Sequence, residues 1–151
     1  MNIIYMTLIS MTAGIAIALQ SSMSGQFSSI IRSPSWTSLV IYLTSSIVMS
    51  TYLLITKTRA PSLETLKLVP THLWFMGAFL SVFALTLVYW QMPKIGVARV
   101  MTGVLTGQLV ISLIAAHYGW FGLPVTSLNS ARVGGLVLML IGLFLINGSS
   151  N

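Results

Sequence analysis

Five uncharged, largely hydrophobic stretches follow one another along this chain, and the charged residues and all five prolines lie between them. A helix needs about 20 mostly apolar residues to cross the hydrocarbon core of a bilayer, with roughly 17 to 25 tolerated. The stretches that approach or meet this length run over 2–20, 36–56, 72–92, 100–116 and 133–147. The last is the shortest and would extend into the neutral tail or cross with little tilt. The pattern therefore predicts five membrane-spanning helices.

Three further features of the stretches favour helices that stay in the membrane. Strands of a membrane barrel would alternate hydrophobic and polar residues over about ten positions, and these stretches do not. The first stretch imitates a signal peptide through Ala16-Ile17-Ala18, but no Lys or Arg precedes it and its apolar core is longer than usual. The tryptophans lie near the ends of the stretches, where amphipathic rings favour the membrane interface. They are Trp36, Trp74, Trp90 and Trp120. We expect an all-α integral membrane protein with a single transmembrane domain over 1–151.

Composition supports the same class. Hydrophobic residues make up 56% of the chain and charged residues only 5%, whereas a soluble domain is about 25% charged. The seven Lys and Arg stand singly between apolar stretches, and Glu64 is the one acidic residue. This spacing indicates contact with anionic lipid head groups rather than with nucleic acid. The absence of cysteine excludes disulfides, thiolate chemistry and cysteine-based metal sites.

The basic residues are distributed almost evenly over the two sides of the membrane. With five spans, four of them fall on the side of the N-terminus and three on the other. The first side holds Lys57, Arg59, Lys67 and Arg132, and the second holds Arg32, Lys94 and Arg99. An excess of one charge is a weak signal for orientation. Insertion in both orientations would allow an antiparallel homodimer, the arrangement that inverted-repeat transporters build into one chain. Alternatively, Arg132 lies within the end of the fifth span and one orientation prevails.

Two glutamines interrupt the apolar stretches: Gln20 ends the first, and Gln108 is near the middle of the fourth. An amide that faced hydrocarbon would leave its donors and acceptors unpaired, at a cost of several kcal/mol. Gln108 should therefore face the interior, and Ser112, one turn later, shares its face. Either it makes an interhelical hydrogen bond, worth about 0.6 kcal/mol on average in membranes, or it lines a cavity near the midplane and orients a polar substrate.

Helical spacing also gathers aromatic residues on the third span. Phe79, Phe83, Thr86 and Trp90 share one face and are joined by Tyr89. This face either lines a ligand site or packs against lipid or a partner helix. A mildly polar face on the second span, with the same two interpretations, consists of Tyr42, Ser46, Met49 and Ser50.

Small residues recur at four-residue spacing in every span, as is typical of closely packed membrane helices. The stripes are Ser10-Gly14-Ala18, Ser46-Ser50, Gly77-Ser81, Gly103-Gly107 and Ala131-Gly135. Pro93 and the Gly103-Gly107 surface are the places where we expect a helix to bend or slide.

The spans contain no Asp or Glu, because Glu64 lies in a loop. An intramembrane carboxylate is the usual proton relay or cation partner of a transporter, so proton-coupled export of cationic drugs loses its simplest mechanism. His72 and His117 border spans, and histidine changes charge between about pH 5 and 8. They are the coupling candidates, unless they are simply solvated at the interface. No nucleotide-binding loop, metal-ligand cluster or nucleophile–base pair is present, so we expect no enzyme, cofactor or metal.

Several motifs occur together in a specific order. The third span begins HLWFMGAF, the fourth lies in MPKIGVARVMTGVLTGQLVISLIAAHYGWFGLP, and the fifth lies in LNSARVGGLVLMLIGLFLI. The first span ends in GIAIALQSSM. With these motifs the chain resembles the YdcZ-type five-span family of the drug/metabolite transporter superfamily, least closely over 26–69.

The resemblance implies a multi-pass transporter or exporter of the bacterial inner membrane. Larger relatives carry two five-span halves in opposite orientation, so a five-span chain would be a half-transporter. The family-like positions are Gln20, Trp74, Pro93, Gly96, Gln108, Gly119, Gly122, Arg132 and Gly134. Family members often have Asp where this chain has His117, which puts proton coupling in doubt or moves it to histidine.

We therefore predict an exporter of small metabolites or amphipathic compounds that works by alternating access as an antiparallel homodimer. Its partners would be a second copy, the lipid bilayer and the substrate. The predicted cavity residues are Gln20, Trp74, Phe83, Thr86, Tyr89, Trp90, Gln108 and Ser112, and the predicted packing or hinge residues are Pro93, Gly96, Gly103 and Gly107. The alternative is a structural subunit of a larger membrane complex, with one fixed orientation, a different partner chain and only a packing role for Gln108.

Overall fold

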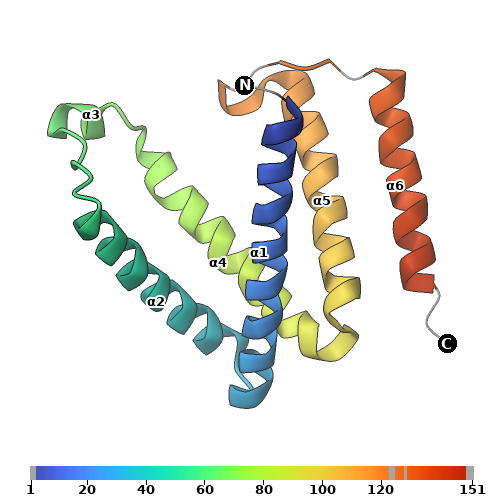
Figure 1. The fold of residues 1–151 in the computed structure, drawn as a ribbon, viewed down its shortest axis with the longest axis horizontal. Helices are drawn as coiled ribbons and strands as arrows, with labels where there is room; N and C mark the ends of the chain where they lie inside the picture. The colour runs from blue at the N-terminus through green and yellow to red at the C-terminus, as the bar shows by residue number, and fades with distance from the viewer. Residues whose placement is uncertain (1–2, 123–124, 128, 149–151) are drawn as a thin grey trace. The chain divides into compact units, whose positions relative to one another are not determined.

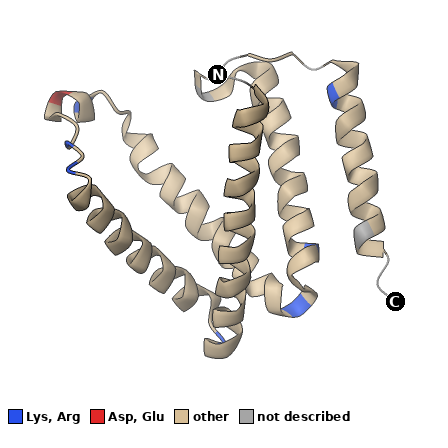
Figure 2. Cartoon of the chain, viewed as in Figure 1, with Lys and Arg blue, Asp and Glu red and all other residues tan. Residues whose placement is uncertain are grey.

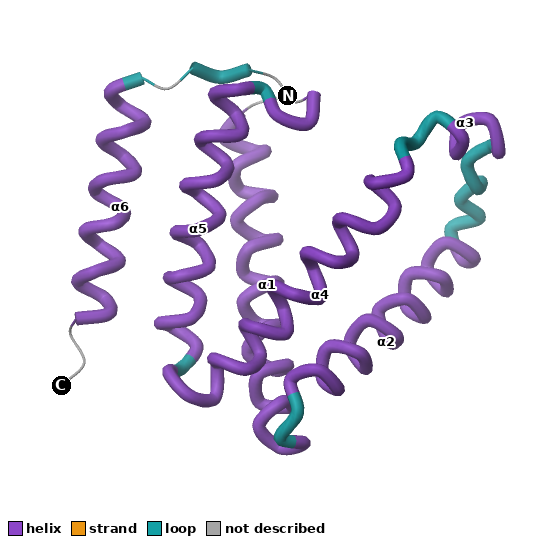
Figure 3. The backbone as a smooth tube through the Cα atoms, turned by 180° about the vertical axis from the view of Figure 1, so that it is seen from behind, coloured by secondary structure: helices purple, strands orange, loops and turns teal. Residues whose placement is uncertain are grey.

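The regular elements of the chain are helices. The structure is a computed structural model that describes residues 3–122, 125–127 and 129–148, and over these residues Figure 3 shows only helices and loops. The elements in Figure 1 are α1 (Ile3–Ile31), α2 (Pro34–Ile55), α3 (Leu63–Lys67), α4 (Thr71–Ile95), α5 (Val97–Tyr118), the 3₁₀ helix η1 (Trp120–Gly122) and α6 (Ser130–Gly148). The prediction of an all-helical protein is confirmed.

Four of these helices, α1, α2, α4 and α5, are long and apolar enough to cross a membrane. The apolar part of α6, Ser130–Leu145, is shorter. The chain is thus a helical membrane protein with four helices of full spanning length, and the predicted five crossings stay a prediction. The predicted start of the first span, Asn2, lies outside the described residues, as does Pro124 in the predicted loop before the last span.

Local chemistry explains where the helices begin. Ser33, with extended backbone, caps α2 by accepting a hydrogen bond from the Trp36 amide at 3.4 Å, and Pro34 follows at the first helical position. Ser62 caps α3 in the same way by accepting from the Thr65 amide at 3.2 Å. At the start of α6, the Asn129 side chain accepts from the Arg132 amide at 2.9 Å. Short polar side chains thus satisfy amides that the first turn of a helix leaves free.

Two glycines form the ends of α5. Gly96, between α4 and α5, has φ of 84° and ψ of 158°, a combination that is essentially restricted to glycine. Gly119 ends α5 in the left-handed conformation, and its amide donates to the Ala115 carbonyl. The family-like positions Gly96 and Gly119 therefore mark the turns at the two ends of this helix.

The chain divides into two compact units. Residues 1–94 form the first, with α1, α2, α3 and α4 up to Lys94, and residues 95–151 form the second, with α5, η1 and α6. The boundary lies one residue after Pro93. Proline lacks the amide that would bond to the Tyr89 carbonyl, although α4 continues to Ile95.

Besides packing along α2, helix α1 comes close to α4 in the first unit. A Cβ built on Gly25 would lie 2.7 Å from the Met92 sulfur, so the two helices meet closely here. Ser21, Ser24 and Ser28 are buried along the same side of α1. The helix runs past Gln20, the predicted end of the first span, to Ile31. These small residues are buried there although they are less hydrophobic than those before them.

Charged side chains lie at the ends of the long helices, in the loops or in the short helix α3 (Figure 2). Many large hydrophobic side chains point outward from the helices; Leu54, Phe75 and Phe144 are at least 70% exposed. Because lipid tails are as apolar as these side chains, a membrane protein does not need to bury them. The distribution fits helices that lie within a bilayer and have charges at its two surfaces.

Candidate functional site

The first unit contains an apolar groove between α2 and α4, which run in opposite directions and are connected through α3 (Figures 1 and 3). Its volume is about 700 Å³, within the range of roughly 300 to 1,000 Å³ that is usual for small-molecule pockets. The residues that line it are Ser35, Ser38, Leu39, Tyr42, Ala78, Phe79, Val82, Phe83, Thr86 and Leu87. We call this site the α2–α4 groove.

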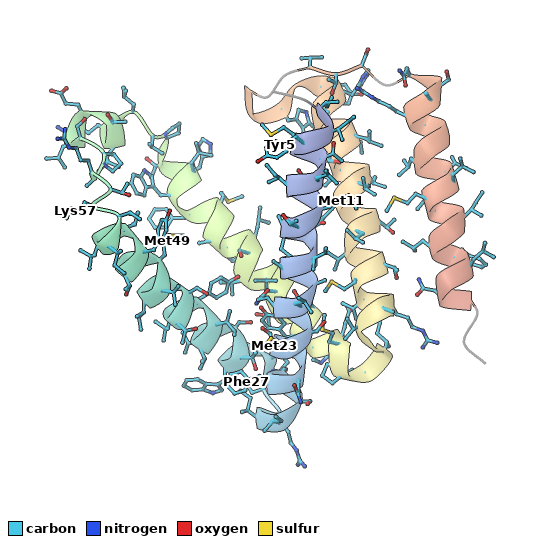
Figure 4. The ribbon with its side chains drawn as sticks, viewed as in Figure 1. Tyr5, Met11, Met23, Phe27, Met49 and Lys57 are labelled. Carbon is cyan, nitrogen blue, oxygen red and sulfur yellow. The ribbon has the colours of Figure 1, made fainter. Side chains whose placement is uncertain are left out.

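Two hydroxyl pairs connect the helices that form the α2–α4 groove. The Ser38 and Thr86 hydroxyl oxygens are 2.9 Å apart, and those of Tyr42 and Ser81 are 2.6 Å apart. Ser38 and Tyr42 are one turn apart on α2, so the two pairs are spaced by about 6 Å along this helix. Met49, two turns after Tyr42, lies on the same side of α2 (Figure 4).

The remaining lining is hydrocarbon. Phe79 and Phe83 form much of the wall and are 70% and 60% exposed. None of the described residues that line the groove is charged. A site of this kind binds an apolar body through the walls and a small polar group through the hydroxyls, and it offers no counter-ion for a charged ligand.

The predicted aromatic face of α4 separates into three environments. Phe83 and Thr86 line the α2–α4 groove. Tyr89 is completely buried, and its hydroxyl is 2.9 Å from the Gln20 amide nitrogen. Trp90 is 49% exposed, and the Lys94 ammonium lies 3.3 Å from the centre of its ring, a cation–π contact.

Gln20 connects α1 to α4. Its amide nitrogen donates to the Tyr89 hydroxyl at 2.9 Å and lies 3.2 Å from the Ser24 hydroxyl, while its amide oxygen accepts from the Ser21 hydroxyl at 3.4 Å. A side chain with these partners has its polar atoms satisfied within the chain. Here Gln20 has an interhelical hydrogen bond, and its role toward a substrate stays a prediction.

The other predicted residues of the first unit lie elsewhere. Trp74 and His72 are exposed near the start of α4 and are not among the residues that line the α2–α4 groove. Both histidine roles in coupling stay predictions. The hinge role of Pro93 also stays a prediction.

In the second unit, Gln108 and Ser112 are exposed on α5. The Ser112 hydroxyl donates to the Leu109 carbonyl at 2.9 Å within its own helix, whereas the Gln108 amide has no hydrogen-bond partner among the described residues. No atom of the described residues lies within 4 Å of a Cβ built on Gly103 or Gly107. His117 makes an edge-to-face contact with Tyr118, with ring centres 4.9 Å apart. The roles predicted for these residues are not tested by this arrangement.

Three features of these units were not predicted from the sequence. The Thr102 hydroxyl on α5 lies 3.2 Å from the amide nitrogen of Asn147 on α6. Ser38 was missed, although it is one turn before Tyr42 on the face already noted. The sequence does not single out Gly25, because the hydrophobic stretch ends at Gln20. Extending a helical face by one turn from Tyr42 reaches Ser38, and extending the small-residue stripe of α1 by two turns from Ala18 reaches Gly25.

No metal centre is evident in the part of the chain that the structure describes, because no three His, Asp or Glu side chains lie together there. Residues 5–145 match the model of a family described as "Putative inner membrane exporter, YdcZ". No curated protein and no solved structure matches the chain.

Proposed function

The chain belongs to the YdcZ family of inner membrane exporters, and on this premise we propose that it exports small metabolites or amphipathic compounds by alternating access as an antiparallel homodimer. The family is one of exporters and not of enzymes, and the protein is a multi-pass protein of the inner membrane. The observation that carries the proposal is the α2–α4 groove, because it combines the volume of a ligand site with hydroxyl groups inside an apolar span.

The proposed antiparallel dimer rests on the distribution of basic residues over the two sides of the membrane and on the Gly103-Gly107 surface of α5. Four basic residues against three on the two sides give little preference for one orientation. Two opposed copies would reproduce the symmetry of inverted-repeat transporters, whose sites lie at the repeat interface near the midplane. The Gly103-Gly107 surface is open to close approach by a partner helix.

Gln108 has a specific place in this proposal. It lies well inside a span and has no partner among the described residues of the second unit, so in a bilayer its amide needs water, substrate, the first unit or a second copy. We place Gln108 and Ser112 in a cavity that the dimer encloses, where the amide orients a polar group of the substrate. His72 and His117 remain the proposed coupling residues, in the absence of a carboxylate within the described spans.

The test is release of solutes from liposomes that contain the purified protein. The liposomes are loaded with a small-molecule extract of bacterial cells, and the external medium is analysed by mass spectrometry over time. We expect at least one solute to leave faster than from protein-free liposomes. Gln108→Ala should slow this release roughly three- to ten-fold, the equivalent of one lost hydrogen bond.

The matched control is Gln26→Ala, the same change at an exposed position on α1, which should leave release unchanged. If no solute leaves faster than from protein-free liposomes, the exporter proposal is wrong for this chain. If Gln108→Ala behaves like Gln26→Ala, the role of Gln108 is wrong while export stands.

A further inference from the structure

Each hydroxyl pair of the α2–α4 groove has one O–H donor that bonds to no acceptor among the described residues. A hydroxyl has one donor and two acceptor lone pairs, so in each pair one hydroxyl donates to the other. The second hydroxyl of each pair keeps its own O–H, for which the described residues offer no further acceptor. Ser22 and Ser46, in contrast, donate to carbonyls of their own helices at 2.7 and 2.8 Å.

These two donors lie where a lipid tail cannot satisfy them. Ser38, Tyr42 and Thr86 are lining residues of the groove and belong to helices that are long and apolar enough to span the membrane. Hydrocarbon offers no acceptor, and an unpaired polar group in it costs free energy. An occupant with a carbonyl, ether or hydroxyl oxygen would accept from them, whereas an acyl chain would leave them unpaired.

The charge of the groove decides the charge of the occupant. Its described lining contains no Lys, Arg, His, Asp or Glu. An ammonium group would meet only neutral hydroxyls and aromatic rings, which do not replace a carboxylate, and a carboxylate or phosphate would meet no cation. The lining therefore favours an uncharged molecule.

The aromatic walls of the groove indicate the apolar part of the bound molecule and its route of entry. Phe79 and Phe83 leave most of their surface uncovered on the side of the groove that the described chain does not close. In a bilayer this surface faces the hydrocarbon core, so a molecule dissolved in the membrane reaches it sideways without passing through water.

From these observations we infer that the α2–α4 groove binds an uncharged amphipathic molecule that enters from within the bilayer. Its apolar body lies against Phe79 and Phe83, and its oxygen acceptors, up to two of them about 6 Å apart, receive the hydroxyls of the Ser38–Thr86 and Tyr42–Ser81 pairs. The inference rests on the proposed export function and adds the chemical class of its substrate.

The experiment compares three photoreactive probes that share a benzophenone body and differ in charge. The purified full-length protein in lipid nanodiscs is irradiated with 4-(hydroxymethyl)benzophenone, which is neutral, with its trimethylammonium analogue or with 4-benzoylbenzoate. Mass spectrometry then measures how much of each probe is attached to α2 and α4, relative to α6. We expect the neutral probe to label Leu39, Val82 and Leu87 in preference to α6, and the charged probes to show no such preference.

Two variants make the result specific. Ala78→Trp fills the groove from an exposed lining position and should abolish the preference. The double variant Ser38→Ala with Thr86→Val removes one hydroxyl pair and should lower labelling roughly three- to ten-fold at low probe concentration. The matched control is Ser10→Ala with Thr51→Val, whose hydroxyls donate to carbonyls of their own helices, and it should label like the unmodified protein.

The inference is overturned if Ala78→Trp leaves the labelling pattern unchanged, or if a charged probe shows the stronger preference for the groove. Labelling that occurs only on α6 overturns it as well, because a lipid tail or a second copy then occupies the groove. Release of solutes from liposomes is measured on the same preparations. If solutes are exported but the groove is not labelled, only the inference about the groove is wrong. If the groove is labelled but no solute is exported, only the proposed function is wrong.

Discussion

At the scale of single residues, small and hydroxylated side chains determine how the helices of the first unit meet. Gly25 lets α1 approach Met92, the Gln20 amide bonds to the buried Tyr89, and two hydroxyl pairs join α2 to α4. Without a hydrophobic drive between helices in lipid, such contacts are the ones that hold spans together. The large apolar side chains, which dominate the sequence, are mostly exposed on the surface of the helices.

Gly25→Ala should therefore destabilise the protein. The new Cβ would lie 2.7 Å from the Met92 sulfur and 2.9 Å from the Met92 Cβ, and overpacking of this kind costs about 1 to 3 kcal/mol. The control is Gly14→Ala in the same helix, where no atom of the described residues lies within 4 Å and the better helix propensity of alanine favours stability. Thermal unfolding in detergent, followed by tryptophan fluorescence, checks this. Equal midpoints for the two variants would contradict a tight crossing at Gly25.

At the scale of elements, the helix ends follow from a few capping and turn residues. Ser33, Ser62 and Asn129 cap helices, and Gly96 and Gly119 allow the turns at the ends of α5. Arg132, a family-like position, also donates from its guanidinium to the Ser127 carbonyl at 2.9 Å, so it makes a hydrogen bond before α6 in addition to carrying charge.

Gly96→Ala should strain the turn between α4 and α5. A φ of 84° with ψ of 158° is open to glycine only, so alanine there costs about 1 to 3 kcal/mol. Gly103→Ala, in the regular part of α5 with no described atom near the new Cβ, is the control and should be neutral or slightly stabilising. Unfolding by a rising fraction of denaturing detergent compares the two. If both variants unfold at the same detergent fraction, the chain does not need this turn conformation.

At the scale of the whole molecule, the assembly depends on orientation in the membrane. The balance of basic residues over the two sides is so even that both orientations are expected. A five-span chain in both orientations can form the two-fold arrangement that a ten-span relative builds into one chain.

The orientation can be measured because the chain has no cysteine. Ser29→Cys at the end of α1 and Ser127→Cys in the loop before α6 report opposite sides of a five-span chain. Each is labelled in intact cells with an impermeant thiol reagent and again after permeabilisation. We expect about half of each variant to be labelled from outside. Labelling of one variant but not the other would mean a fixed orientation and would contradict the antiparallel homodimer. Ser149 would report the same side as Ser29, but it lies outside the described residues.

The sequence alone determined the class of the protein, its helices and its family. The length and hydrophobicity of a span and the capping at its ends are local properties, so they can be read without knowing what lies opposite. The tertiary structure decided which faces meet. The aromatic face of α4 looked uniform in sequence, yet Phe83 and Thr86 line the α2–α4 groove, Tyr89 is buried against Gln20, and Trp90 contacts Lys94. Which side chain on another helix lies opposite each of these residues depends on helix crossings that no local pattern encodes.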